Sequence, residues 1–175
     1  MWLTKILKQL FKKPKTTSSV IGVSGLGLIA ILATPMIQDH EGLRVSAYLD
    51  PIGVPTICSG ETLGVKLGDT ETVESCNAML KPRLESFLKE MRACTTVTLP
   101  PKTEAAFLSF TYNVGSGTYC KNIARKRLNV GKLVEACEAL SLYKYAGGKV
   151  FNGLIRRRAE EREMCLLGLE EGGKL

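Results

Sequence analysis

Residues 41–60 read EGLRVSAYLDPIGVPTICSG, and the local character of the chain changes within this stretch. Upstream of it, Thr34 is a favourable helix N-cap because a proline follows it at the first helical position. Gly42 is a favourable helix stop, so the sequence predicts a short helix that ends at Glu41. Residues 48–60 are rich in glycine, proline and β-branched side chains, which predicts a small hairpin-rich sheet directly after that helix.

After residue 72 the apolar residues adopt the three-and-four spacing of an amphipathic helix. This pattern runs from Val73 to Met91 and predicts one long helix with a kink at Pro82. Further helices are expected between glycine-containing breaks, at 103–114, 119–128, 133–143 and 153–167. The sequence therefore predicts an α+β arrangement, in which a long helix joins a small β-containing lobe to a mostly helical lobe. A cleft between two such lobes suits an extended ligand.

The chain has 175 residues, of which 45% are hydrophobic, and a formal net charge of +7. This composition excludes a disordered protein and fits one domain with a sizeable core. Residues 1–15 hold five lysines and no acidic residue, whereas residues 16–175 hold 19 basic and 17 acidic residues. Apolar residues recur opposite the lysines at helical spacing, which predicts a basic amphipathic N-terminus at a membrane surface. The rest of the chain is nearly balanced in charge, so we expect no nucleic-acid partner.

Residues 16–38 contain no charged side chain. As a helix these 23 residues would reach roughly 34 Å, enough to cross a hydrocarbon core of about 30 Å. Glycine, alanine, serine and threonine dilute the apolar residues, so insertion is marginal and retention in the bilayer is expected to be reversible. The segment predicts a signal anchor with a cytoplasmic N-terminus and an exported body, residues 39–175. A cleaved signal peptide, which lacks an Ala-x-Ala site here, and a buried core helix are the alternatives.

Six cysteines follow the uncharged segment, namely Cys58, Cys76, Cys94, Cys120, Cys137 and Cys165. An even number of well-separated cysteines in an exported body predicts disulfides, whereas the alternative is six buried thiols in a cytosolic protein. Fifteen pairings are open, and we take Cys94–Cys120 as a trial pairing. There is no C-x-x-C motif and only one histidine, so we expect no metal site and no cofactor.

Two carboxylates and a hydroxyl fall in the predicted helix end and hairpin, at Glu41, Asp50 and Thr56. Cleavage of a glycosidic bond needs two carboxylates in unlike environments, one to donate a proton and one to direct a nucleophile. Spacing alone is weak support, because pairs of surface carboxylates are common.

The E-x8-D-x5-T pattern of these three residues resembles the signature of the phage-type lysozymes, glycoside hydrolase family 24. Two later stretches also resemble that family, FTYNVG at 110–115 and GLIRRR at 153–158, the latter followed by Glu161 and Cys165. The resemblance runs from about residue 39 to residue 169. It departs from the family at 58–64, CSGETLG, where the family commonly has a plainer G-x-G, and this leaves the substrate contacts of the hairpin tip open.

The resemblance implies a lysozyme-like two-lobe fold and a muramidase that hydrolyses the β-1,4 bond between N-acetylmuramic acid and N-acetylglucosamine in peptidoglycan during host lysis. Glu41 would be the general acid, Asp50 would position the water, and Thr56 would help to hold it. The family usually inverts the anomeric centre, which requires room for a water between the carboxylates. A monomer is expected.

The uncharged segment at 16–38 is similar to the signal-arrest-release segments of exported phage endolysins. This likeness implies a form tethered to the host inner membrane that is later released into the periplasm. The predicted helix at 34–41 shares residues with the segment, so these residues cannot lie in the bilayer and in the folded domain at the same time. We therefore expect release to let residues 20–38 pack onto the domain and set Glu41 in the cleft.

Two other functions remain as alternatives. A lytic transglycosylase works with a single glutamate, and the presence of both Asp50 and Thr56 argues against it. A membrane-tethered wall-binding or pore-forming protein would need no catalytic residue, and residues 1–38 would then do the work. The three ordered motifs, the E-x8-D-x5-T pattern and the two later stretches, favour the muramidase.

Three further polar features have simple structural interpretations. His40 is expected to be a surface histidine. Residues 156–163, RRRAEERE, are expected to form a solvated helix face with ion pairs at i,i+4 spacing. This face could also line the cleft. Asn113 is expected to end a helix or to contact a sugar.

Overall fold

The computed structural model describes residues 25–50 and 52–175. The predicted amphipathic N-terminus at 1–15 and the first part of the 16–38 segment lie outside the described residues. Within the described part of the chain, no helix combines the length and the hydropathy that a membrane span requires.

The first helix, α1, runs from Gly25 to Glu41 and therefore begins nine residues earlier than predicted. Pro35 lies inside it, and the Thr34 hydroxyl donates to the carbonyl of Ala30 instead of capping the helix. Proline removes only one hydrogen bond from the ladder, and burial of an apolar face offsets that loss. Its buried side chains are Ile29, Ala30, Ala33 and Ile37. For residues 25–38 the structure thus shows the core helix that the sequence left as an alternative.

The helix ends where the sequence predicts. Gly42 has a φ of +78°, a backbone conformation that glycine adopts without strain, and its N–H donates to the carbonyl of Gln38. The chain then enters strand β1, Arg44–Leu49, which pairs antiparallel with β2, Pro55–Cys58. The predicted hairpin is confirmed.

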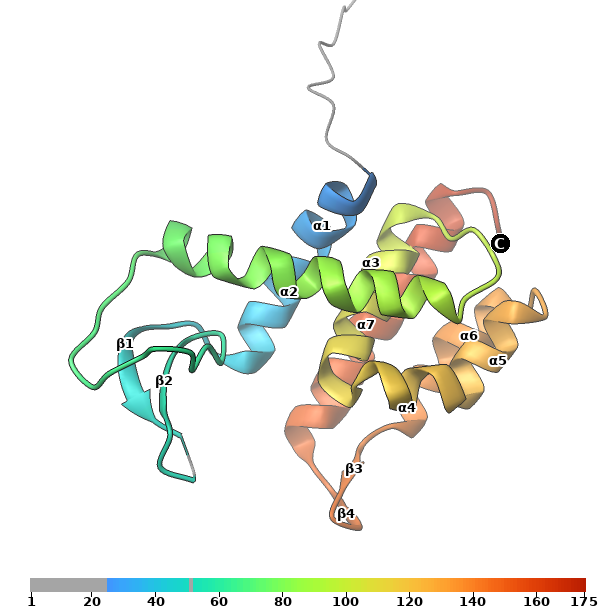
Figure 1. Cartoon of the computed structure of the whole chain (residues 1–175). Coiled ribbons are helices and arrows are strands. Elements are labelled where there is room, and N and C mark those ends of the chain that lie inside the picture. The colour runs from blue at the N-terminus through green and yellow to red at the C-terminus, as the bar shows by residue number, and fades with distance from the viewer. Residues whose placement is uncertain (1–24, 51) are drawn as a thin grey trace, which may run out of the picture.

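The helical lobe is built around α3, Pro101–Val114, which packs against α1, α2 and α7 (Figure 1). Helix α2, Val73–Ala93, connects the β1–β2 hairpin to this lobe, and α7, Asn152–Glu171, crosses behind α3. The buried core includes Phe107, Phe110, Leu84, Leu88 and Ile37. The protein therefore has the two-lobe α+β arrangement that the sequence predicts.

Two of the predicted helices are divided. The stretch at 119–128 is α4, Ser116–Lys121, and α5, Ile123–Asn129, separated at Asn122, whose side chain accepts from the backbone N–H of Arg125 and caps α5. The stretch at 133–143 is α6, Leu133–Ala139, followed by a 3₁₀ turn, Leu140–Leu142.

The glycine pair at 147–148 also does more than separate helices. Both residues have positive φ, and they turn a small hairpin between β3, Tyr145–Ala146, and β4, Lys149–Val150. This second hairpin precedes α7 and was not expected from the sequence.

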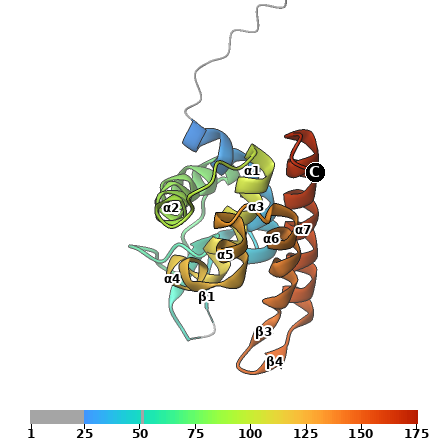
Figure 2. The same ribbon diagram turned by 90° about the vertical axis from the view of Figure 1, so that its right-hand side faces the viewer.

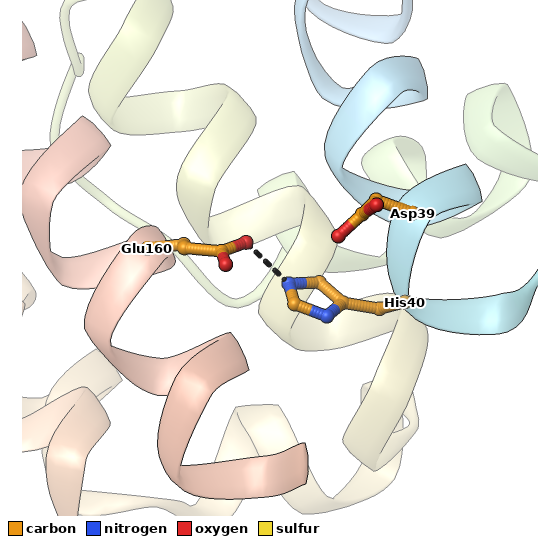
Figure 3. Close-up of side chains that lie close together, drawn as sticks. All are labelled: Asp39, His40 and Glu160. Carbon is orange, nitrogen blue, oxygen red and sulfur yellow. Dashed lines mark ion pairs between the residues drawn. The ribbon is translucent and has the colours of Figure 1, made fainter.

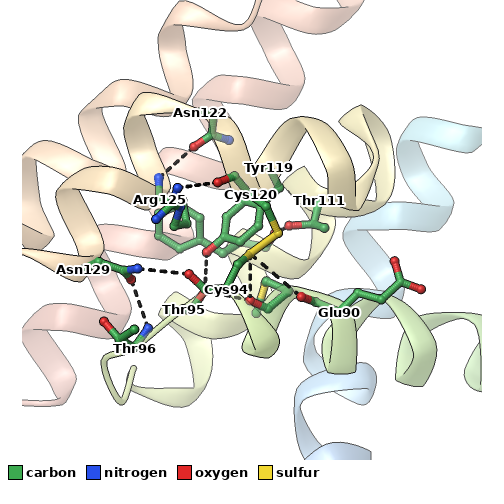
Figure 4. Close-up of a disulfide and its surroundings, with 12 residues drawn as sticks. Glu90, Cys94, Thr95, Thr96, Thr111, Tyr119, Cys120, Asn122, Arg125 and Asn129 are labelled. Atoms are coloured by element: carbon green, nitrogen blue, oxygen red, sulfur yellow. Dashed lines mark hydrogen bonds between the residues drawn. A yellow bond between two sulfur atoms is a disulfide. The ribbon is translucent and has the colours of Figure 1, made fainter.

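All six cysteines form disulfides, as predicted. Cys58–Cys76 joins β2 to α2, and Cys137–Cys165 joins α6 to α7. The trial pairing Cys94–Cys120 is confirmed and ties the end of α2 to α4 (Figure 4). Each bond closes a loop in the unfolded chain and so stabilises the folded state. Each bond also joins two different elements in the folded protein.

Candidate active site

Glu41 is the last residue of α1, and its side chain keeps 31% of its surface exposed. The Glu41 Oε1 atom accepts a hydrogen bond from Arg157 Nη1 at 2.6 Å. Arg157 lies near the start of α7 and is itself buried, so a partly exposed carboxylate is tied to a fixed cation. A charge-assisted bond of this kind restricts the rotamers that the carboxylate can adopt.

The Arg157 guanidinium is held by two further partners. Its Nε donates to Glu161 Oε1 at 3.1 Å, and its Nη2 donates to the carbonyl of Ser109 at 3.2 Å. The Ser109 hydroxyl also donates to Glu161 Oε1, at 2.8 Å. Arg157 therefore bridges helices α1, α3 and α7 with three different nitrogens, which a lysine could not do.

Glu161 is fully buried and forms ion pairs with two arginines, Arg157 and Arg158. Its Oε2 lies 3.2 Å from Arg158 Nε, and Arg158 Nη2 donates to Asn113 Oδ1 at 2.7 Å. Burial raises the pKa of Glu161, and the charges of Arg158 and Arg157 oppose that rise. Burial also lowers the pKa of Arg158 to about 10, so Arg158 still carries its charge at neutral pH. Glu161 thus lies between the two arginines, and Arg157 is the one that reaches Glu41.

This buried network corrects the expected solvated face at 156–163. The ion pairs at i,i+4 spacing are present, Arg156 with Glu160 and Arg157 with Glu161. Only the Arg156 pair is exposed, because α7 turns Arg157 and Glu161 toward α3, its main packing partner. Hydropathy could not reveal this burial, since charged side chains are buried only when partners elsewhere in the chain compensate them.

Glu41 lines a pocket of about 380 Å³ between the end of α1, the end of α3 and the start of α7. A second pocket of about 420 Å³ shares Asn113, Ala146 and Leu154 with the first and continues toward Tyr143 and Tyr145. The two pockets adjoin through these shared residues and make one groove. Asn113 thus lines the groove as well as standing one residue before the end of α3.

His40 is not a surface residue, because only 4% of its side chain is exposed. Its Nε2 lies 2.8 Å from Glu160 Oε2 on α7 (Figure 3). Burial lowers the pKa of His40, and the charge of Arg157 lowers it further, while Glu160 and Asp39 oppose both effects. The expectation failed because α7 covers this end of α1.

Asp39, His40 and Glu160 offer ligand atoms within 4.8 Å of one another (Figure 3). Arg156 already supplies a cation to this group, with its guanidinium 3.4 Å from Asp39 Oδ2 and 3.6 Å from Glu160 Oε1. The three residues are accounted for by these ion pairs, and we assign no metal to them.

Asp50 and Thr56 lie together at the turn of the β1–β2 hairpin. The Asp50 Oδ1 atom accepts from the backbone N–H groups of Ile52 and Val54, at 3.0 and 2.8 Å. The buried Thr56 hydroxyl donates to the carbonyl of Val54 at 2.9 Å. A single turn residue, Val54, therefore links the carboxylate and the hydroxyl.

The structure brings Asp50 and Thr56 together through Val54. In the described part of the chain, no side-chain hydrogen bond or ion pair joins Glu41 to either residue, and neither lines the pocket that contains Glu41. β1 connects the two places directly, since it begins three residues after Glu41 and ends just before Asp50. The roles predicted for all three residues stay predictions.

Sequence reasoning did not single out Arg157 as part of this site. It recognised the i,i+4 pairing with Glu161 but not the contact with Glu41, which lies 116 residues away. It also missed Tyr112, whose hydroxyl donates to the carbonyl of Ser59 at 3.4 Å and so links α3 to the β lobe. Burial raises the pKa of Tyr112, so it remains a donor at neutral pH.

Comparison with known proteins agrees with this architecture. The family model described as phage lysozyme matches residues 38–161. A SAR-endolysin of Enterobacteria phage PA-2 is 35% identical over 157 residues, covering 88% of this chain and 95% of the relative. A SAR-endolysin of Pseudomonas phage phiKMV is 39% identical over 130 residues, covering 72% of this chain and 81% of the relative.

Solved structures show the same likeness. An endolysin from an Escherichia coli O157:H7 phage, FAHEc1, superposes with a TM-score of 0.70 at 30% identity, covering 77% of this chain and 90% of the other. The muramidase domain of SpmX from Asticaccaulis excentricus gives a TM-score of 0.69 at 28% identity, covering 77% and 94%. The chain therefore belongs to the phage lysozyme family and is a lysozyme-type hydrolase that acts on peptidoglycan.

Proposed function

We propose that this protein is an endolysin that hydrolyses the β-1,4 bond between N-acetylmuramic acid and N-acetylglucosamine, with Glu41 as general acid, Asp50 as the carboxylate that directs water and Thr56 as its helper. The observation that carries the proposal is the position of Glu41, a partly exposed carboxylate that is fixed by Arg157 at the wall of a groove. The resemblance in family supplies the substrate class.

The two carboxylates share an arrangement that fits these roles. Each has one oxygen committed to the protein, Oε1 of Glu41 to Arg157 and Oδ1 of Asp50 to the hairpin turn. Among the described residues, the second oxygen of each carboxylate has no hydrogen-bond partner. One oxygen thus orients the group and the other is left for substrate or water.

The reaction follows from those free oxygens. Protonated Glu41 donates its proton to the glycosidic oxygen as the bond to the anomeric carbon breaks. Water attacks that carbon from the opposite face and passes a proton to Asp50. Because the Thr56 hydroxyl donates to Val54, its lone pairs are available to accept the other hydrogen of the water. The products are two sugar ends, and net one water is consumed.

Replacing Glu41 by glutamine in the full chain tests the assignment. Glu41→Gln keeps the size of the side chain but removes the proton donor, so we expect the rate of cell-wall turbidity loss to fall by about a hundredfold or more. Glu163→Gln, at an exposed position of the same α7 helix that holds Arg157, is the matched control and should retain full activity. Retention of full activity by Glu41→Gln would contradict the glycosidase mechanism.

Mass spectrometry of the released fragments tests the bond and the chemistry in the same experiment. Hydrolysis predicts fragments that end in a reducing N-acetylmuramic acid, whereas a lytic transglycosylase would leave an anhydro end. A reducing N-acetylglucosamine end would place the cut at the other glycosidic bond of the polymer and would overturn the muramidase assignment.

We also propose that residues 16–38 tether the protein to the inner membrane before it is released into the periplasm. Two features of α1 support a second environment for this segment. Leu28 and Ile31 are exposed on the folded protein, where they contribute little to the core, while the opposite face of the helix is buried. A bilayer would cover both faces, so the exposed apolar residues are explained by the tethered form.

A further inference from the structure

The basic side chains of the body are concentrated in one short segment. Residues 121–132 hold five basic residues and no acidic one, whereas the other residues after position 15 hold 14 basic and 17 acidic residues. The near balance of residues 16–175 therefore hides a strong asymmetry. We call the outward surface formed by residues 121–134 the α5 surface; the basic residues of this segment are Lys121, Arg125, Lys126, Arg127 and Lys132, of which Arg125 has a buried Nε.

The geometry of α5 turns several of these residues outward. Ala124 and Leu128 are buried beneath the helix, so the opposite face looks away from the core. Ile123, Lys126, Arg127 and Val130 follow one another at the spacing of a single helix face. The N–H of Lys132 donates to the carbonyl of Arg127, which brings the start of α6 beside the end of α5. Figure 2 looks onto this side of the molecule, with α4, α5 and α6 toward the viewer.

The basic residues of this surface are not ion-paired within the described structure, and the nearest acidic residue along the chain is the exposed Glu135. In the part of the chain that the structure describes, none of the five basic residues has an ion-pair partner within 4 Å. The two arginines of the segment donate to backbone carbonyls instead, Arg125 to that of Cys120 and Arg127 to that of Glu135. The Cys94–Cys120 disulfide and the Asn122 cap hold this region, so the charges are presented on a fixed scaffold (Figure 4).

Exposed aliphatic side chains lie among the charges. Ile123 is 40% exposed and Val130 is 69% exposed, and Val134 is also exposed at the start of α6. A polysaccharide or nucleic acid would gain nothing from these side chains, and residues 121–134 contain no aromatic ring that could stack on a base or sugar. Cations with interspersed aliphatic residues are the composition of surfaces that lie on anionic bilayers.

We infer that the α5 surface binds the face of an anionic phospholipid bilayer. The lysines would lie at the level of the lipid phosphates, and Ile123 and Val130 would enter the boundary between headgroups and acyl chains. None of residues 121–132 lines either pocket of the groove, and the N–H of Ile123 donates to the hydroxyl of Tyr143, an outer residue of the groove. The contact with the bilayer is separate from the predicted anchor and would keep the released, folded domain at the membrane surface.

A probe placed on the surface itself distinguishes this contact from the anchor. In the full chain, Val130→Cys adds one thiol to a protein whose native cysteines are all paired, and it can carry an environment-sensitive fluorophore. We expect a blue shift with phosphatidylglycerol vesicles, no shift with phosphatidylcholine vesicles, and reversal by high salt. The same label at Leu67→Cys, an exposed apolar position of the β lobe, should not shift with either.

Charge reversal gives the quantitative test. Converting three exposed lysines of the α5 surface to glutamate should weaken binding to phosphatidylglycerol vesicles by roughly tenfold or more; these are Lys121, Lys126 and Lys132. The matched control reverses three exposed lysines elsewhere that have no ion pair, Lys66, Lys81 and Lys89. It changes net charge equally and should leave binding within about twofold of wild type.

Three results would overturn the inference. These are an unshifted label at position 130 on anionic vesicles, an equal shift at position 67, or equal loss of binding in the two triple variants. A label that responds to isolated peptidoglycan but not to vesicles would assign the surface to the cell wall instead. Wall-lysis activity is measured in parallel, and its loss in Glu41→Gln alone would leave this inference standing.

Discussion

At the scale of single residues, the site depends on how Arg157 is held. Its three nitrogens bond to Glu41, Glu161 and the carbonyl of Ser109, so the guanidinium fixes the catalytic candidate relative to two helices. A substitution that keeps the positive charge but removes the forked guanidinium tests the hydrogen-bond geometry of Arg157 separately from its charge.

We expect Arg157→Lys to lower kcat by about 10- to 100-fold, because a lysine cannot satisfy three partners and Glu41 loses its fixed rotamer. KM should change little, since the groove wall stays in place. Arg162→Lys, farther along α7 and outside the groove, is the control and should behave as wild type. Steady-state kinetics on soluble wall fragments measures both constants, and an unchanged kcat for Arg157→Lys would remove Arg157 from the positioning role.

His40 gives the molecule a defined pH dependence of stability. Its folded-state pKa lies below the ordinary value of 6.5, chiefly because its side chain is buried. When pH falls below that ordinary value, the unfolded chain binds a proton before the folded chain does, so the free energy of unfolding decreases. This contribution is complete above the unfolded pKa and is lost as pH falls toward the lowered folded value.

We therefore expect His40→Gln to reduce the difference between the free energies of unfolding at pH 7 and pH 5. His40 is the chain's single histidine, so no second imidazole obscures the comparison. Denaturant unfolding at the two pH values gives the difference for each protein. An identical difference in wild type and His40→Gln would mean that His40 is not held neutral by its burial.

At the scale of elements, the sequence predicted the parts whose signals are local. The spacing of apolar residues identified α2, glycine-containing breaks delimited α3 and α7, and Gly42 marked the end of α1. The hairpin between β1 and β2 was also predicted, because its turn residues lie close together in the sequence. These features need no knowledge of what packs against them.

The errors occurred where tertiary partners decide. An uncharged apolar segment looks the same whether a bilayer or a protein core covers it, so the start of α1 at Gly25 could not be read from the sequence. The break between α4 and α5 had a local signal in Asn122, which is a favourable helix N-cap. The predicted helix boundaries were set at glycines only, so this cap was missed. Within the site, Glu41, Asp50 and Thr56 were named from a motif, whereas Arg157 depended on a contact between distant helices.

At the scale of the whole molecule, α1 connects the location of the protein to its chemistry. Its buried face contributes to the core between α2 and α3, and its last residue is Glu41. A chain whose residues 25–38 lie in a bilayer cannot form that core at the same time. In the tethered form that we propose, Glu41 and Arg157 would not be arranged in this way, so we expect the tethered form to be inactive.

Substitutions at two isoleucines of α1 test its membrane-bound state and its folded state separately. Ile31 is 60% exposed in the folded domain, so Ile31→Ser should weaken the membrane-bound form and leave the folded form nearly as stable as wild type. We expect the released fraction, measured by separating membranes from soluble periplasm, to rise by at least about twofold. Ile29→Ser removes the same apolar group from a buried position, so it should also favour release but destabilise the folded domain by about 2 kcal/mol or more. Thermal unfolding of the released proteins distinguishes the two variants, and an unchanged released fraction for Ile31→Ser would contradict the use of α1 as an anchor.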